Sequence, residues 1–207
     1  MPITTTRSRA EAARRRERRI LAGLLAIVAL LVIGGGGLLW LASAPVEEQA
    51  PIGGPFQLTA SDGRNVTDRD FRGKYLLIYF GYTICPDVCP TTLQSVAQAL
   101  DTLGGKADRL QPLLVTVDPA RDTPAVLKDY MSNFDPHLRG LTGDQASIDA
   151  ATRAYRVYAK KVPLDGGDYT MDHTAIVYLM DKNGQFVAPF DLKRTADAAA
   201  ADLRRYL

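Results

Sequence analysis

Residues 75–90 read YLLIYFGYTICPDVCP, and this stretch decides the fold. Its first six residues, Tyr75–Phe80, are apolar on both faces, which is typical of a strand at the centre of a sheet. The only two cysteines of the chain, Cys85 and Cys89, follow in the next turn with three residues between them. Two thiols between a strand and a helix can exchange disulfides or bind a soft metal ion. The stretch therefore predicts a redox site, a metal site or both.

Strand and helix patterns alternate on either side of this stretch. Upstream, 56–59 and 66–67 are expected to pair as a hairpin around Asp62-Gly63. Downstream we expect, in chain order, a helix over 91–103, a strand over 113–117, a helix capped by Thr123, a helix over 145–154, an extended segment over 155–162, strands over 175–180 and 185–190, and a helix over 195–207. This order predicts an α/β thioredoxin-like sandwich, in which helices flank a central mixed sheet.

The beginning of the chain predicts a membrane anchor. Residues 1–19 contain seven Arg and two Glu, and no charged residue occurs from 20 to 44. A helix from Ile20 to Trp40 would span about 30 Å, the thickness of the bilayer hydrocarbon, and the basic flank places the N-terminus in the cytoplasm. Ala42-Ser43-Ala44 resembles a signal-peptidase site, so a cleaved export signal stays an alternative, although Pro45 disfavours cleavage.

The predicted organisation is therefore a basic cytoplasmic N-terminus (1–19), one transmembrane anchor (20–41), a linker (42–54) and a thioredoxin-like domain (55–207) on the periplasmic side of the inner membrane. The first nineteen residues carry a formal charge of +5. Because the whole chain carries +2, the remaining residues carry −3. A mildly acidic domain lacks the basic face that nucleic-acid binding needs.

Three segments resemble the signature segments of the Sco/SenC family. They are YFGYTICPDVCP at 79–90, VDPARDTP at 117–124 and YTMDHT at 169–174, and the likeness extends from Gly54 to Phe190. Ile84 departs from the polar residue that relatives often have there, at a position that is not a ligand in the family.

This resemblance implies a membrane-tethered copper-binding metallochaperone that helps assemble the binuclear copper centre of cytochrome c oxidase. It implies that Cu(I), Cu(II) or both are held by Cys85, Cys89 and His173. The implied partners are the copper-binding subunit of the oxidase and other periplasmic copper chaperones.

The chemistry of these residues agrees with the resemblance. Thiolates prefer Cu(I), imidazole binds both oxidation states, and three donors make a low-coordinate site that can release its ion. We expect the amide dipoles of a helix beginning at Thr91 to lower the pKa of Cys89, and Asp172 to orient the imidazole or tune its basicity. No proline occurs between Asp168 and Thr174, where thioredoxin-like oxidoreductases usually hold a cis-proline, and this favours a ligand.

Other interpretations stay open. The cysteines could form a structural disulfide, although so short a loop stabilises little, or act in a thiol-disulfide oxidoreductase on the oxidase subunit or its chaperones. A thiol peroxidase is weaker, because Thr83-Ile84-Cys85 supplies only part of the expected motif. His137 is interpreted as a surface residue. For Asp118, Arg121 and Asp122, a functional role and an ion-paired supporting loop explain the pattern equally well.

Overall fold

The computed structural model describes residues 23–25, 27, 29–31, 33–34, 51–192 and 194–207. The chain divides into two units, Met1–Ala50 and Pro51–Leu207. The predicted anchor (20–41) and linker (42–54) lie largely outside the described residues. Within the described part of the chain, no helix combines the length and apolarity that crossing a bilayer requires.

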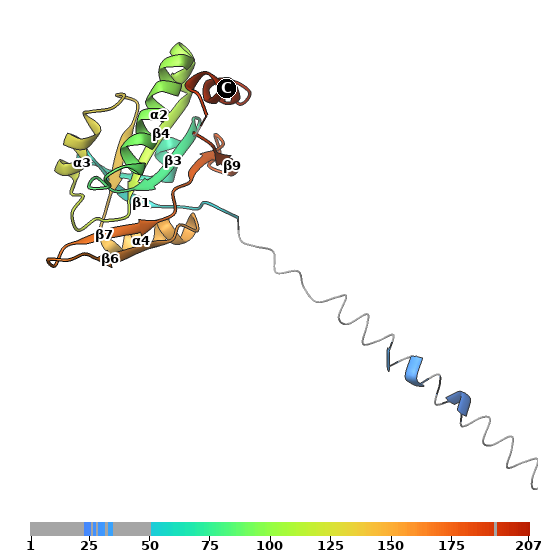
Figure 1. The fold of residues 1–207 in the computed structure, drawn as a ribbon. Helices are drawn as coiled ribbons and strands as arrows, with labels where there is room; N and C mark the ends of the chain where they lie inside the picture. Colours follow the sequence, from blue (N-terminus) through green and yellow to red (C-terminus); the bar gives the residue numbers. More distant parts are fainter. Residues whose placement is uncertain (1–22, 26, 28, 32, 35–50, 193) are drawn as a thin grey trace, which may run out of the picture. The chain divides into compact units, whose positions relative to one another are not determined.

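The second unit is built on a mixed seven-stranded sheet with the order β2-β1-β5-β4-β3-β8-β9 (Figure 1). The strands of this sheet are β1 (Gln57–Ala60), β2 (Asn65–Thr67), β3 (Tyr75–Gly81), β4 (Leu110–Thr116), β5 (Arg139–Thr142), β8 (Val177–Met180) and β9 (Phe186–Phe190). The pairs β3–β4 and β4–β5 are parallel, whereas β1–β2, β1–β5, β3–β8 and β8–β9 are antiparallel.

The two central strands are buried because their sequences are apolar on both faces. All seven residues of β4 are buried, and β3 is buried from Leu76 onward. The helices that accompany the sheet are α2 (Val88–Leu103), α3 (Pro124–Met131), α4 (Gln145–Ala154) and α5 (Ala196–Leu203). Helix α2 connects the parallel strands β3 and β4 and packs beside α5 (Figure 1). The predicted α/β class, with helices around a central mixed sheet, is confirmed.

Capping residues determine where several helices begin. The hydroxyl of Thr123 accepts from the amide of Val126, and Pro124 occupies the first turn of α3. Asp144 caps α4 and Thr195 caps α5 in the same manner. Short 3-10 helices at Asp68–Phe71 and Gly104–Arg109 precede β3 and β4.

The structure differs from the sequence prediction at three places. Helix α2 begins at Val88 rather than Thr91, which puts Cys89 inside its first turn. Strand β5 was not predicted, because its sequence RGLT is short and lacks a clear alternation. A separate two-stranded sheet joins β6 (Ala159–Pro163) to β7 (Tyr169–His173), where we expected only an extended segment ending at 162.

Candidate metal centre

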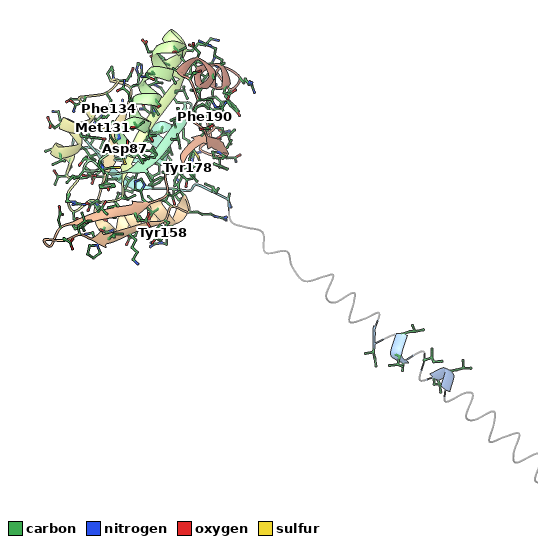
Figure 2. All side chains as sticks on the ribbon, viewed as in Figure 1. Asp87, Met131, Phe134, Tyr158, Tyr178 and Phe190 are labelled. Atoms are coloured by element: carbon green, nitrogen blue, oxygen red, sulfur yellow. The ribbon has the colours of Figure 1, made fainter. Side chains whose placement is uncertain are left out.

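The cysteine turn lies where β3 ends and α2 begins. The amide of Cys85 donates to the carbonyl of Tyr82 at 3.4 Å, and the amide of Cys89 lies 3.4 Å from Cys85 Sγ. Asp87, labelled in Figure 2, is the N-cap of α2 but makes no capping bond with its side chain. The turn thereby directs one thiol toward the first backbone amides of the helix.

The two thiols differ in how far they are buried. Cys89 belongs to the core-facing stripe of α2, together with Leu93, Val96 and Leu100, and it is 0% exposed. Cys85 precedes the helix and is only half-buried. Both thiols are free in the structure. One sulfur therefore lies in the core and the other at its edge.

His173 meets this pair from the end of β7. Its Nε2 lies 3.7 Å from Cys89 Sγ, and the donor atoms of Cys85, Cys89 and His173 all lie within 4.8 Å of one another. Its Nδ1 lies 3.2 Å from the carbonyl oxygen of Thr174. Because a carbonyl only accepts, the proton in this contact belongs to Nδ1, which leaves the lone pair of Nε2 directed to the thiols. The structure thus brings together all three residues that the sequence singled out.

Asp172 does not orient the imidazole as we expected. Neighbouring residues of a strand point to opposite faces, and Asp172 is exposed while His173 is half-buried. The rings of Tyr79 and Tyr82 instead lie edge-on to His173, at centroid distances of 6.2 and 5.7 Å. Aromatic packing and the Thr174 carbonyl hold the ring.

The expectation that the helix lowers the pKa of Cys89 is wrong. Burial raises the pKa of this thiol to about 12, because the apolar surroundings disfavour the thiolate more than the hydrogen bonds from Tyr82 and Tyr79 favour it. The Tyr79 hydroxyl donates to Cys89 Sγ at 3.6 Å. In the metal-free protein Cys89 is accordingly a protonated thiol at neutral pH.

The segment 118–122 supports the cysteine turn through hydrogen bonds to Asp122. The carboxylate of Asp122 is fully buried and accepts from Thr83, at 2.6 Å from its hydroxyl and 3.1 Å from its amide, and from the hydroxyl of Thr116 at 2.5 Å. Burial raises the pKa of Asp122. Since Thr83 lies two residues before Cys85, this network holds the start of the cysteine turn.

Asp118 and Arg121 support the hairpin of β6 and β7, which carries His173. Arg121 Nε lies 2.5 Å from Asp118 Oδ2, its guanidinium stacks 3.7 Å above the ring of Tyr169, and the Tyr169 hydroxyl donates to Asp118 at 2.9 Å. The Tyr82 hydroxyl also bonds to Thr170 at 2.8 Å. These contacts favour the supporting-loop interpretation of Asp118, Arg121 and Asp122.

Sequence reasoning missed Tyr79, Tyr82 and Thr170 as parts of the site. Tyr79 lies inside an apolar run, where an aromatic residue predicts only a core position. Tyr82 and Thr170 are 88 residues apart, so only the tertiary structure reveals the contact. His137, interpreted as a surface residue, is partly exposed and pairs with Asp135 and Asp108 rather than with the thiols.

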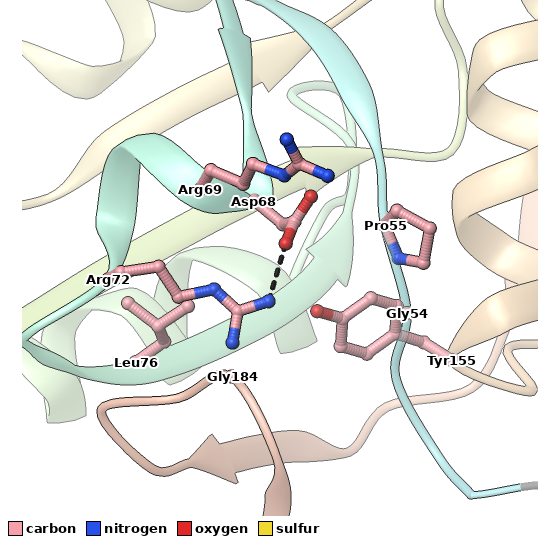
Figure 3. A pocket seen from close by; sticks show the side chains of 8 residues that line it. All are labelled: Gly54, Pro55, Asp68, Arg69, Arg72, Leu76, Tyr155 and Gly184. Carbon is pink, nitrogen blue, oxygen red and sulfur yellow. Dashed lines mark hydrogen bonds and ion pairs between the residues drawn. The ribbon is translucent and has the colours of Figure 1, made fainter.

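A polar hollow of about 220 Å³ lies beside the first residues of β3, whereas the cysteine turn follows its last residue. Figure 3 shows the ion pair between Arg72 and Asp68 inside it, at 2.6 Å, with Arg69 alongside. Gly184 lies there with a φ of 71°, in the left-handed region that favours glycine. The hollow contains no residue of the candidate centre.

The fold and the site define a thioredoxin-like protein in which two thiols at a strand-to-helix junction lie close to an imidazole from β7. The family model described as SCO1/SenC matches residues 44–207. The chain therefore belongs to the SCO1/SenC family, and the predicted family resemblance is confirmed.

Solved structures and curated relatives agree with this assignment. The structure of Bradyrhizobium japonicum ScoI with copper bound is 60% identical, with a TM-score of 0.73, and the match covers 75% of this chain and 99% of that one. Yeast Sco1 with copper bound is 42% identical, with a TM-score of 0.67, over 76% of this chain and 91% of that one. The human mitochondrial SCO1 homolog is 41% identical over 75% of this chain and 53% of its own length. The chain thus spans about half the length of such curated relatives.

Proposed function

We propose that this protein is a copper metallochaperone that assists assembly of the binuclear copper centre of cytochrome c oxidase. Copper is its cargo, held by Cys85, Cys89 and His173. The observation that carries the proposal is the convergence of these three donor atoms within 4.8 Å, although 84 residues separate Cys89 from His173.

The donor set fits a copper ion. Sulfur and imidazole ligands lie about 2.0–2.3 Å from a zinc ion, so two donors on one such ion are at most about 4.6 Å apart. The three donor atoms here, within 4.8 Å of one another, would need to move only slightly closer to bind one ion. Two sulfurs and one imidazole suit Cu(I), and the imidazole also accommodates Cu(II). Copper-bound relatives that are 60% and 42% identical support the choice of metal.

Incomplete burial of the centre suits transfer. Cys89 is enclosed, whereas Cys85 and His173 are half-buried, so an incoming donor atom can approach from their side. Three protein donors leave room for a further ligand from an acceptor. These residues would hold the ion firmly on the core side and release it on the exposed side.

The copper-binding subunit of the oxidase is the proposed acceptor, and other periplasmic copper chaperones are proposed as further partners. We further propose that residues 20–41 anchor the chain in the inner membrane, with the N-terminus in the cytoplasm and the domain in the periplasm. The arginine-rich start and the uncharged segment after it support this topology.

Anaerobic copper titration tests the proposal. We expect one copper ion per chain for the reduced wild type, and at least tenfold weaker binding for Cys85→Ser, Cys89→Ser and His173→Ala. Sulfur-to-Cu(II) charge-transfer bands should weaken and shift when one cysteine is replaced and disappear when both are replaced. His137→Ala is the matched histidine control and should load as the wild type does. Equal loading of all variants would refute the ligand assignment.

A second function, thiol-disulfide exchange, is favoured by the two free thiols within one turn. In this reaction Cys85, the more accessible thiol, attacks a disulfide of the partner and forms a mixed disulfide while releasing one partner thiol. Cys89 then displaces the second partner thiol, so the partner gains two electrons and the pair becomes a disulfide. His173→Ala distinguishes the functions, because it should weaken copper binding and leave exchange with a model disulfide unchanged.

A further inference from the structure

An apolar groove of about 570 Å³ lies beside the candidate centre. One wall is the first two turns of α2, and the other is formed by the segment before β8 and the end of β9. We call it the α2–β9 groove. Figure 2 labels Asp87 and Phe190, one from each wall. The residues that carry the argument are Asp87, Val88, Thr92, Ile176, Phe190 and Leu192.

Apolar atoms remain exposed on both walls. Val88 is 47% exposed and Ile176 is 40% exposed. The polar residues of the helix wall are already engaged, since the Thr92 hydroxyl donates to the Val88 carbonyl at 2.7 Å and Ser95 donates to the Thr91 carbonyl at 3.0 Å. A groove of this kind favours an occupant with apolar side chains.

Among the described residues that line the groove, the charged side chains are all acidic. Asp87 and Asp191 are the only charged residues among those that line it in the described part of the chain. Asp191 lies 3.7 Å from Arg194. For Asp87, no ion pair with a described basic side chain is present, and its carboxylate accepts from the Thr91 hydroxyl at 3.4 Å. A basic side chain on the occupant would therefore complement the Asp87 end.

The groove is continuous with the candidate metal ligands along the chain. Val88 immediately precedes Cys89, and Ile176 follows His173 by three residues. A copper ion moves between proteins only when donor atoms of the acceptor come within bonding distance, so an acceptor segment must pass close to this wall. The groove is placed to hold that segment while its ligands reach the centre.

We propose that the α2–β9 groove docks the copper-accepting subunit of the oxidase. Its occupant is an extended segment of that subunit, with apolar side chains against Ile176 and Leu192 and a Lys or Arg against Asp87. This inference rests on the proposed function and specifies where the acceptor binds.

The domain 51–207 can be tested alone, because it forms a compact unit, and 75% of this chain is enough to cover 99% of a solved relative. The probe is the reduced, copper-free soluble domain of the oxidase copper subunit from the same organism, with affinity measured by calorimetry. We expect Ile176→Glu and Asp87→Lys each to weaken association at least tenfold, through a buried charge and through charge reversal. Copper loading of Ile176→Glu should equal that of the wild type.

Val126→Glu on α3 is the matched control, because Val126 is 41% exposed and does not line the groove. It should bind the oxidase domain as the wild type does. Wild-type affinity for Ile176→Glu, or no association between the wild type and the oxidase domain, would overturn the docking surface while copper loading still supported the proposed function. Absence of copper loading by the wild type would instead refute the proposed function itself.

Discussion

Close packing around Gly81 constrains the buried thiol. A Cβ at this position would lie 2.9 Å from Cys89 Sγ, 2.9 Å from a ring carbon of Tyr79 and 3.2 Å from Leu114. These distances are too short for ordinary contact, and the backbone at Gly81 is held by its pairing with Thr116 of β4 and by the hydrogen bond from the Val117 amide. Gly81 therefore allows Cys89 to lie directly against the central strand.

Gly81→Ala should displace Cys89 and Tyr79. We expect copper affinity to fall at least tenfold and the free energy of unfolding to decrease by about 1–3 kcal/mol, the usual cost of overpacking a core. Copper titration and urea unfolding measure the two effects. Gly105→Ala is the control, because a Cβ at that position would have no neighbouring atom within 4 Å, and unchanged copper affinity in Gly81→Ala would contradict the packing argument.

His137 supplies a pH-dependent contribution away from the centre. A hydrogen bond with Asp135, at 2.7 Å from Nδ1, raises the pKa of His137 above its ordinary value, with Asp108 contributing. The folded-state pKa then exceeds the unfolded value of about 6.5. The stabilisation is complete below the unfolded pKa and is lost as pH rises through the folded-state pKa.

His137→Gln should therefore lower the free energy of unfolding more at about pH 5.5 than at about pH 8.5. Urea unfolding at both pH values measures this difference, and proton NMR gives the His137 pKa directly. Asp135→Asn should bring that pKa back down. A His137 pKa at or below the ordinary histidine value would show that the ion pair is absent in solution.

At the scale of elements, the β6–β7 hairpin decides whether the imidazole reaches the thiols. It lies outside the main sheet, and every residue of β6 is exposed. Its position depends on a few side-chain contacts, chiefly those of Arg121 with Tyr169 and of Tyr82 with Thr170. Loss of such a contact should affect His173 more than the cysteine turn.

Arg121→Lys tests this role of the hairpin contacts. Lysine keeps the charge but loses the planar stacking on Tyr169 and the fork of donors to Asp118 and the Tyr169 carbonyl. We expect weaker copper binding and a changed nitrogen signature in the Cu(II) paramagnetic resonance spectrum, with unchanged thiol reactivity. Arg153→Lys on the exposed face of α4 is the control, and an unaltered spectrum for Arg121→Lys would argue against the positioning role.

At the scale of the whole molecule, copper binding should be linked to folding. The proposed ligands come from the β3–α2 junction and from β7, so an unfolded chain would not hold them together. An ion that binds only the folded state stabilises it by about 2.7 kcal/mol at a free concentration one hundred times the dissociation constant. A copper ion bound by the proposed ligands would thereby join the hairpin to the main sheet.

Thermal unfolding of domain 51–207 measures this linkage. Saturating Cu(I) under reducing conditions should raise the melting temperature by about 5–10 °C. Cys85→Ser and His173→Ala should lose most of the shift, and His137→Ala should retain it. A full shift in His173→Ala would mean that copper binds without the hairpin.

Local sequence determined most of the architecture by itself. Apolar runs predict β3 and β4, helical periodicity predicts α2 and α4, and Thr123 with Pro124 predicts the start of α3, because each signal is contained within neighbouring residues. The two thiols at the junction of a strand and a helix follow from the same local pattern. Family resemblance added His173 as their companion.

Tertiary structure alone decided how the centre is arranged. Strand β5 forms through pairing with the distant strands β1 and β4, which a short sequence such as RGLT does not indicate. The β6–β7 hairpin pairs locally, but its position beside the cysteine turn depends on contacts such as that between Tyr82 and Thr170. The raised pKa of Cys89 depends on its burial in the folded core, and the contact between Thr83 and Asp122 joins residues that are 39 apart in sequence. Burial and electrostatic surroundings are properties of packed neighbours, and the packing exists only once the chain has folded.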